Sequence, residues 1–166
     1  MRPKVYVETS VISYLVARPN QRDVLVAANQ SVTHEWWDRR RGSFELYISA
    51  VVLAEASRGD QEYAAARIDV ARQLTVVETA QAALDVADAL VQRAGLPATA
   101  YEDALHIAIA AETGMDYLLT WNCKHIANGF IIPRVDRVIR ELATSRHTSV
   151  PRSNFWRSND AERSYR

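Results

Sequence analysis

The sequence has one cysteine and no long apolar run, and both features limit the cellular compartments in which we expect the protein. Because Cys123 is the only cysteine, no intramolecular disulfide can form, which favours a reducing compartment. No uninterrupted apolar run approaches the roughly 20 residues of a membrane span. Met1 leads into RPKVYVE, which lacks the apolar core of a signal peptide. We therefore expect a cytoplasmic protein with no membrane contact.

The sequence also lacks the glycine-rich turns that bind nucleotide phosphates. The segment after the first predicted strand reads ETSVIS, which excludes a dinucleotide-binding turn, and the P-loop signature is absent. A receiver domain is disfavoured because the second predicted strand ends in Ser49 and Ala50 rather than in a phosphoacceptor aspartate. A haloacid-dehalogenase phosphatase needs an aspartate nucleophile after the first strand, where this chain has Glu8.

The chain has no net charge, because 20 basic residues balance 20 acidic ones, so its global charge indicates no partner. A length of 166 residues suits one domain, and 48% hydrophobic with 24% charged residues is ordinary for a soluble globular protein. From residue 144 onward, five arginines accompany two acidic residues, and no periodicity is present. We expect one domain over residues 1–143 and a basic, flexible tail over residues 144–166.

Short β-branched and aromatic runs alternate with helical patterns along the chain. Strands separated by helices predict an α/β fold, in which a parallel sheet has helices on both sides. One long predicted helix has apolar residues at helical spacing and contains Trp36 and Trp37. We expect one of these tryptophans in the core and the other at a protein interface. We expect strands at residues 4–7, 44–49, 74–77 and 117–120, a short helix capped by Thr9 or Ser10, and further helices at residues 22–40, 50–57, 61–72, 80–94, 98–111 and 133–143.

The stretch from residue 98 to 111 is almost wholly apolar and small, yet it contains Glu102, Asp103 and His106. Apolar residues fall on every face of a helix over residues 104–111, so we expect this helix to be buried on all sides. A carboxylate in such a helix is costly unless it is paired, hydrogen-bonded or bound to a cation. Asp103 therefore needs a partner from elsewhere in the chain.

Three further polar residues follow or interrupt apolar runs. Glu8 follows the first predicted strand, Glu55 interrupts a short apolar helix, and Asn122 follows the fourth strand. Binding sites in such sheets lie at the carboxyl ends of the strands, where converging carboxylates would repel each other unless they share a cation. Mg²⁺ and Mn²⁺ take such oxygen ligands, and they can activate water for attack on a phosphodiester. The spacing does not prove this convergence, and each acid taken singly also fits a surface position.

Four segments together resemble a known family. They read VYVETSVISYL at residues 5–15, LYISAVVLAEASRGD at residues 46–60 and EDALHIAIAAETGMDYLLTWNCKHIAN at residues 102–128, followed by the helix after Pro133. The chain resembles the PIN-domain family and, within it, the VapC-like toxins of type II toxin–antitoxin systems. The family pattern has an acid after the first strand, a glutamate on a short helix, an aspartate in a buried helix and an aspartate or asparagine after a strand ending in threonine. These positions are occupied by Glu8, Glu55, Asp103 and Asn122.

The resemblance implies a three-layer α/β/α fold with a parallel central sheet, and the activity of a metal-dependent endoribonuclease. It implies an RNA substrate, a cognate antitoxin and a homodimer. Thr120 or Ser10 would orient a ligand or a water molecule. Mg²⁺ or Mn²⁺ would be held, directly or through water, by Glu8, Glu55, Asp103 and Asn122.

Two positions depart from the family pattern. The first acid is usually an aspartate, and the extra methylene of Glu8 moves its carboxylate by roughly 1.5 Å. Asn122 is neutral, so the site has one carboxylate fewer. The alternative is therefore a PIN fold that serves as a nucleic-acid or protein binding module and has a weakened or inactive metal site. His106 fits either a core histidine or a carboxylate partner, and His125 fits either a phosphate contact or a solvated loop.

Overall fold

The computed structural model describes residues 1–145, in which short strands alternate with helices. All predicted strands and helices are present, and their ends differ from the predicted ends by at most three residues. The strands are β1 (Lys4–Val7), β2 (Glu45–Ser49), β3 (Thr75–Val77) and β4 (Tyr117–Leu119). The helices are α1 (Thr9–Val16), α2 (Val24–Arg39), α3 (Ala50–Ala56), α4 (Gln61–Ala71), α5 (Gln81–Arg93), α6 (Tyr101–Glu112) and α7 (Ile132–Ser145), with short 3-10 turns at Arg41–Ser43 and Ala98–Ala100.

The four strands form one parallel sheet in the order β3-β2-β1-β4. β1 is a central strand, in which Val5 lies opposite Leu46 of β2 on one side and Tyr117 of β4 on the other. Val5, Tyr6 and Val7 are all buried, as expected for a strand that is covered on both faces. The parallel order brings the carboxyl ends of β1, β2 and β4 to one edge of the sheet.

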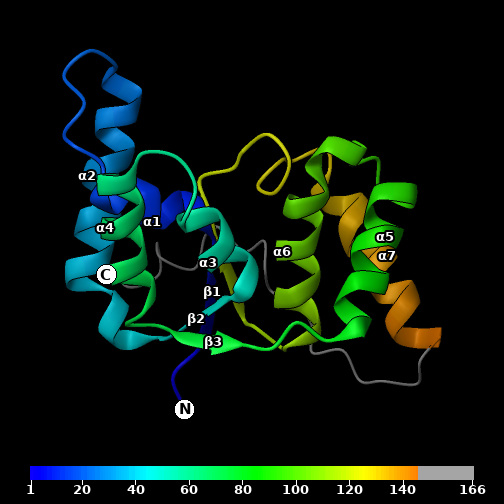
Figure 1. Ribbon diagram of the computed structural model, residues 1–166. Coiled ribbons are helices and arrows are strands. Elements are labelled where there is room, and N and C mark those ends of the chain that lie inside the picture. The colour runs from blue at the N-terminus through cyan, green and yellow to red at the C-terminus, as the bar shows by residue number, and fades with distance from the viewer. Residues whose placement is uncertain (146–166) are drawn as a thin grey trace, which may run out of the picture.

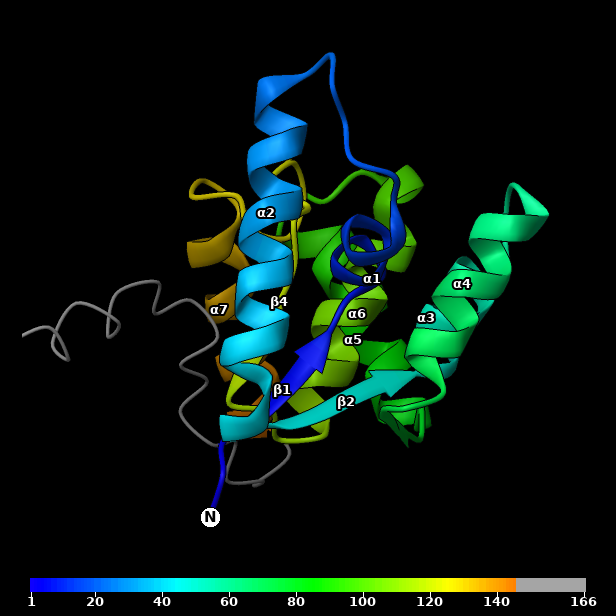
Figure 2. The same cartoon turned by 90° about the vertical axis from the view of Figure 1, so that its left-hand side faces the viewer.

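Helices cover both faces of the sheet, which confirms the predicted three-layer α/β/α fold. In Figure 1, α1, α2 and α4 lie on one side of the strands, whereas α5, α6 and α7 lie on the other. Figure 2, viewed from the side of α2, shows this long helix standing in front of β1 and β4. α1 and α3 begin directly after β1 and β2, so both helices start at the carboxyl edge of the sheet.

α6 is buried along most of its length, as its sequence predicts. Every residue from Ala104 to Ala111 is buried, including His106. The helix begins at Tyr101 rather than at residue 98, because residues 98–100 form a tighter 3-10 turn. It ends before Gly114, whose φ of 65° lies in the left-handed region that favours glycine. Asp103, in the first turn, is therefore held by a helix that packs on all sides.

α2 turns most of its apolar stripe outward, in contrast to the usual burial of such a stripe. Val24, Leu25 and Val32 are 86%, 70% and 53% exposed. Trp36 is half-buried and stacks on Phe44, with ring centroids 5.7 Å apart. The stripe is therefore available to a partner protein. From the sequence, we expected one of the two tryptophans to lie at such an interface.

The opposite face of α2 buries polar groups that find partners inside the molecule. Gln30 accepts from Asn20 N–H at 2.9 Å and donates to the carbonyl of Arg18 at 2.9 Å, which fixes the loop before the helix. Thr33 is buried as well, and Trp37 is the tryptophan that enters the core. Because these polar groups are hydrogen-bonded, their burial carries little penalty.

The described chain ends within the last helix. α7 runs to Ser145, so the domain boundary predicted after residue 143 falls inside this helix. The remainder of the predicted tail, residues 146–166, lies outside the described residues. In the part of the chain that the structure describes, no helix is both long enough and apolar enough to cross a membrane.

Candidate active site

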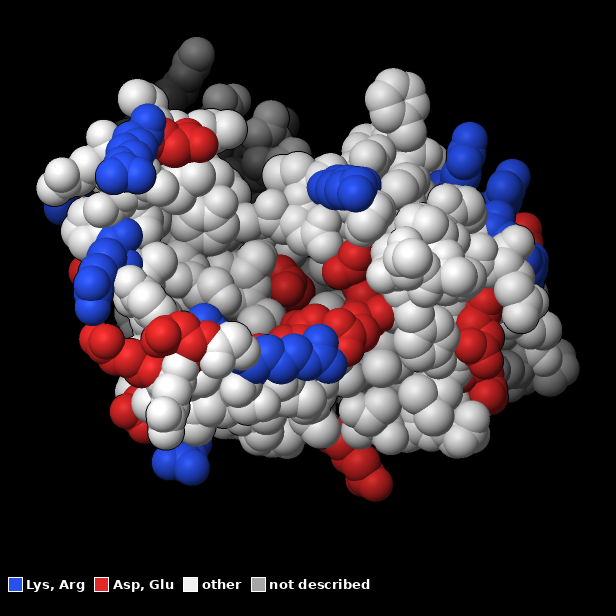
Figure 3. Space-filling view, turned by 45° about the horizontal axis from the view of Figure 1, so that its top comes forward, with Lys and Arg blue, Asp and Glu red and all other residues white. Residues whose placement is uncertain are grey.

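Polar side chains gather where β1, β2 and β4 end and where α6 begins. Figure 3, in which the top of Figure 1 comes forward, shows acidic side chains in a hollow of the surface. A basic side chain lies along each side of this hollow. The hollow therefore combines strong negative charge with cations at its rim.

Glu8 is the first residue after β1, and its side chain caps the N-terminus of α1. Its Oε1 accepts from Ser10 N–H at 3.0 Å, while its Oε2 accepts from the hydroxyls of Ser10 and of Thr120, the latter at 2.8 Å. The prediction that Thr9 or Ser10 caps this helix is wrong, because the Glu8 carboxylate accepts the free backbone N–H. Glu8 is 6% exposed, so these hydrogen bonds fix its carboxylate at the floor of the hollow.

Glu55 reaches the same place from α3. Its Oε2 accepts from the Thr9 hydroxyl and lies 3.0 Å from His106 Nε2. Burial raises the pKa of the Glu55 carboxyl, but the hydrogen bond and charge of His106, the Thr9 hydroxyl and the charge of Arg58 together hold the pKa below its ordinary value. Glu55 is therefore ionised near neutral pH. No described residue donates to its Oε1, which leaves this oxygen available as a ligand.

A buried chain of hydrogen bonds holds Glu55 from inside the fold. His106 Nδ1 lies 2.8 Å from the Tyr6 hydroxyl, and that hydroxyl lies 2.7 Å from Ser49 Oγ, which accepts from Val51 N–H at 3.2 Å. A carboxylate can only accept, so His106 Nε2 carries a proton toward Glu55. Burial raises the pKa of Tyr6, so its hydroxyl also keeps its proton. The Tyr6 hydroxyl thus connects His106 Nδ1 to Ser49 Oγ by hydrogen bonds.

Asp103 belongs to a second group of side chains, formed with the loop after β4. Its Oδ1 accepts from Asn122 Nδ2 at 2.8 Å, and its Oδ2 lies 2.7 Å from His125 Nδ1. Asn122 Oδ1 accepts from the backbone N–H groups of Lys124 and His125, so the amide oxygen faces its own loop. The sequence suggested that His125 either contacts phosphate or lies in a solvated loop, and neither interpretation included this contact with a carboxylate.

Thr120 joins the two groups. Its hydroxyl donates to Glu8 Oε2 and accepts from Asn122 N–H at 2.9 Å. Ser10 Oγ accepts from Trp121 N–H at 2.8 Å, which ties the end of β4 to the start of α1. The structure thus links Glu8 to the loop that holds Asp103.

The acids at the floor of the hollow fit a divalent cation. One potential ligand atom from each of Glu8, Glu55 and His106 lies within 4.8 Å of the others. The two carboxylates are the oxygen donors that Mg²⁺ and Mn²⁺ prefer. His106 fits less well as a ligand, because its Nε2 already carries the proton that faces Glu55. Asp103 falls outside this three-residue cluster and is linked to Glu8 through Asn122 and Thr120.

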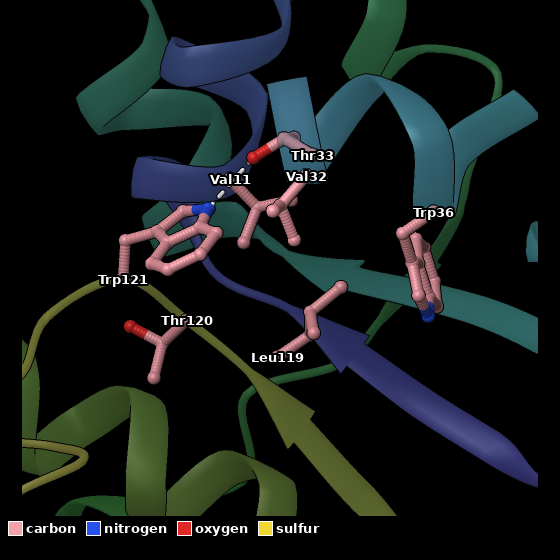
Figure 4. Close-up of a pocket in the computed structure, with 7 residues that line it drawn as sticks. All are labelled: Val11, Val32, Thr33, Trp36, Leu119, Thr120 and Trp121. Atoms are coloured by element: carbon pink, nitrogen blue, oxygen red, sulfur yellow. Dashed lines mark hydrogen bonds between the residues drawn. The ribbon is translucent and has the colours of Figure 1, made fainter. Parts of the chain in front are cut away.

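A separate apolar pocket lies beside Thr120, between α1, α2 and the end of β4 (Figure 4). Its volume is about 170 Å³. Trp121 Nε1 donates to Thr33 Oγ1 at 2.8 Å, which holds the indole in the wall (Figure 4). The pocket has no carboxylate, so it is distinct from the acidic cluster. It is lined by Val11, Val32, Thr33, Trp36, Leu119, Thr120 and Trp121.

The sequence did not identify Tyr6 or Ser49 as part of this site. Tyr6 lies in an ordinary apolar strand, and nothing in the local pattern signals that its hydroxyl meets His106 100 positions later. Ser49 offered one signal, since it is the last residue of β2 and so stands at the carboxyl edge of the sheet. His106 combines both roles that the sequence left open, because it is a core residue and also a partner of Glu55.

Comparisons with known proteins agree with this fold. The family model described as PIN domain matches residues 5–124. The crystal structure of VapC20 from Mycobacterium tuberculosis, described as a toxin that cleaves the sarcin–ricin loop, superposes with a TM-score of 0.56 at 19% sequence identity. The superposition covers 76% of this chain and 95% of VapC20. A search of curated protein sequences gave no match.

Proposed function

The chain belongs to the PIN domain family, and from that premise we propose that it is a metal-dependent endoribonuclease that hydrolyses RNA phosphodiester bonds. The observation that carries this proposal is an ionised Glu55 beside Glu8 at the carboxyl edge of the sheet. Asp103 is linked to Glu8 through Asn122 and Thr120. This arrangement leaves Glu55 Oε1 available as a ligand. A bound cation would activate a water molecule and neutralise charge on the phosphodiester.

We assign the metal to Glu8, Glu55 and Asp103, with Asn122 as a further candidate. Glu55 is the best placed, because His106 and Thr9 engage only its Oε2. Asn122 acts here through its amide nitrogen, which orients Asp103, because its oxygen faces the loop. The donors are oxygens throughout, which suits Mg²⁺ or Mn²⁺.

The likeness to VapC20 supports a more specific version of this proposal. VapC20 is described as a toxin that cleaves an RNA loop, and at 19% identity the likeness shows a shared fold. We propose that this chain is likewise the toxin of a type II toxin–antitoxin pair, acting on RNA in the cytoplasm and bound by a cognate antitoxin. The alternative, a PIN fold that only binds nucleic acid or protein, predicts that the acids take up no metal.

Metal removal is the first test. A mixed, labelled RNA pool is incubated with the protein in Mn²⁺, in Mg²⁺ and in EDTA, while calorimetry follows titration of the metal-free protein with Mn²⁺. We expect cleavage with either metal, none in EDTA, recovery when Mn²⁺ is returned, and uptake of Mn²⁺. A folded protein that takes up no Mn²⁺ and cleaves no RNA would support the binding module instead.

We also propose that the exposed stripe of α2 joins two copies of the chain in a homodimer. Leu25, 70% exposed, would be covered in the dimer, so Leu25→Glu is expected to give a monomer in sedimentation at micromolar concentration. Val76 on β3 is 51% exposed and lies away from the stripe, so Val76→Glu serves as the matched control and is expected to stay dimeric. A wild-type protein that sediments as a monomer would refute the dimer.

A further inference from the structure

Arg58 and Glu102 form a two-point ion pair across the ends of α3 and α6. Arg58 Nη1 donates to Glu102 Oε2 at 2.9 Å, and Nη2 donates to Oε1 at 2.6 Å. These ends also carry Glu55 and Asp103, so the pair lies beside the acidic hollow. The two side chains are 59% and 47% exposed, and an ion pair this exposed contributes little to folding stability. Both partners are therefore accessible to solvent and to a competing anion.

The backbone at Arg58 is held by a neighbouring side chain, whereas its guanidinium is held, among the described residues, only by an exposed carboxylate. Arg67 of α4 donates from Nε to the carbonyl of Ala56 at 3.0 Å and from Nη2 to the carbonyl of Arg58. Gly59 follows with a φ of 86°, in the left-handed region that favours glycine, and turns the chain away from α3. The side chain is thus presented from a rigid turn, and its one side-chain partner among the described residues is exposed enough to be exchanged.

The hollow needs a cation if it is to receive RNA. Four acids lie close to it in the fold, because Glu8 follows β1, Glu55 lies at the end of α3, and Glu102 and Asp103 lie at the start of α6. Each phosphodiester of RNA brings another negative charge. Burial raises the pKa of Glu55, and the charge of Arg58 is among the interactions that lower it, so this guanidinium already acts on the acids of the site. Basic side chains lie along the hollow in Figure 3, where an RNA backbone would enter.

We propose that Arg58 exchanges Glu102 for a phosphate of the RNA strand when substrate binds. This inference rests on the proposed ribonuclease function. A guanidinium offers a phosphate the same pair of parallel N–H donors that it offers a carboxylate. In the free protein, Glu102 holds the guanidinium of Arg58 and therefore competes with RNA for it. Arg58 is thus a phosphate-binding residue, and Glu102 limits the affinity for RNA.

The test is a double-mutant cycle on the full chain. KM for cleavage of a labelled single-stranded RNA is measured with Mn²⁺ across a range of salt, and anisotropy measures binding of the same RNA in EDTA. Arg58→Gln is expected to raise KM and to lower the affinity for RNA, each by about fivefold at about 0.1 M salt. The plot of the logarithm of the association constant against the logarithm of the salt concentration should become less steep by about 0.7. Glu102→Gln is expected to tighten binding. The double variant should have the same KM and the same affinity for RNA as Arg58→Gln, because Glu102 affects RNA binding only by pairing with Arg58.

The pair Arg93–Glu141 is the matched control. It joins α5 to α7 and is exposed to a similar extent, 45% and 49%. Arg93→Gln and Glu141→Gln change the net charge by the same amounts, so they measure the long-range effect of charge alone. Equal effects at both pairs, or a gain from Glu102→Gln that persists in the Arg58→Gln background, would overturn the inference while leaving cleavage intact. A wild-type protein that neither cleaves nor binds RNA would overturn the function and the inference together.

Discussion

Asp103→Asn is expected to lower kcat/KM for metal-dependent RNA cleavage by about a thousandfold or more, since a bound cation supplies several kcal/mol to the transition state. Asparagine keeps the shape of the side chain, and its oxygen can still accept from Asn122 Nδ2, so the loop after β4 stays in place. The variant loses the negative charge that a hard cation requires. Cleavage of the labelled RNA pool with Mn²⁺, together with calorimetric Mn²⁺ titration, measures both effects.

Asp136→Asn is the control for this variant. Asp136 lies on α7 and pairs with Arg140 one helical turn away, at 2.8 Å. The substitution removes the same charge outside the site, and a pair one helical turn apart with a solvent-exposed arginine contributes little to stability. Cleavage is therefore expected to stay at the wild-type rate. A folded Asp103→Asn protein with full cleavage would show that Glu8 and Glu55 hold the metal without Asp103.

Tyr6→Phe is expected to lower the free energy of unfolding by about 1–3 kcal/mol, because it leaves buried polar groups without partners. His106 Nδ1 and the Ser49 hydroxyl each lose their hydrogen bond to Tyr6. His106 would then be free to turn away from Glu55. We expect Mn²⁺ affinity to fall by about tenfold, as it does when other groups that orient a metal ligand are removed. Urea unfolding and calorimetry measure the two effects on the same preparation.

Tyr47→Phe makes the same chemical change on the neighbouring strand. The Tyr47 hydroxyl donates to Glu45 at 3.1 Å and is not buried, so its removal is expected to leave both stability and Mn²⁺ affinity nearly unchanged. A Tyr6→Phe protein that loses stability but binds Mn²⁺ normally would limit the buried chain to a structural role.

The order of elements was predictable because each carries a local signal. β1 reads as an apolar run, and α6 reads as a helix that is apolar on every face. The parallel sheet follows from their alternation with helices, and the sheet in turn predicts that polar residues at strand ends share one edge. This reasoning brought Glu8, Glu55, Asp103 and Asn122 into consideration, and their roles in metal binding stay a prediction.

The contacts between those residues were not predictable, because they depend on side-chain directions across distant segments. The sequence gives no sign that Asn122 turns its nitrogen toward Asp103 and its oxygen toward the loop. The outward stripe of α2 was equally hidden, since its spacing is the same whether the stripe faces core or solvent. Gln30 and Thr33 decide that orientation through partners that lie 10 or more positions away.

The order in which the site residues occur along the chain has a consequence for protein synthesis. β1 is made first, but it can pair with β4 only after more than a hundred further residues have been made. Thr120 and Asn122 follow β4 and are made later still. Until then, Glu8 lacks the Thr120 hydroxyl and Asp103 lacks the Asn122 amide. Domains fold largely as units as they leave the ribosome. A nascent chain therefore cannot complete the hydrogen bonds of its acidic site until β4 and the loop after it have been made and have left the ribosome.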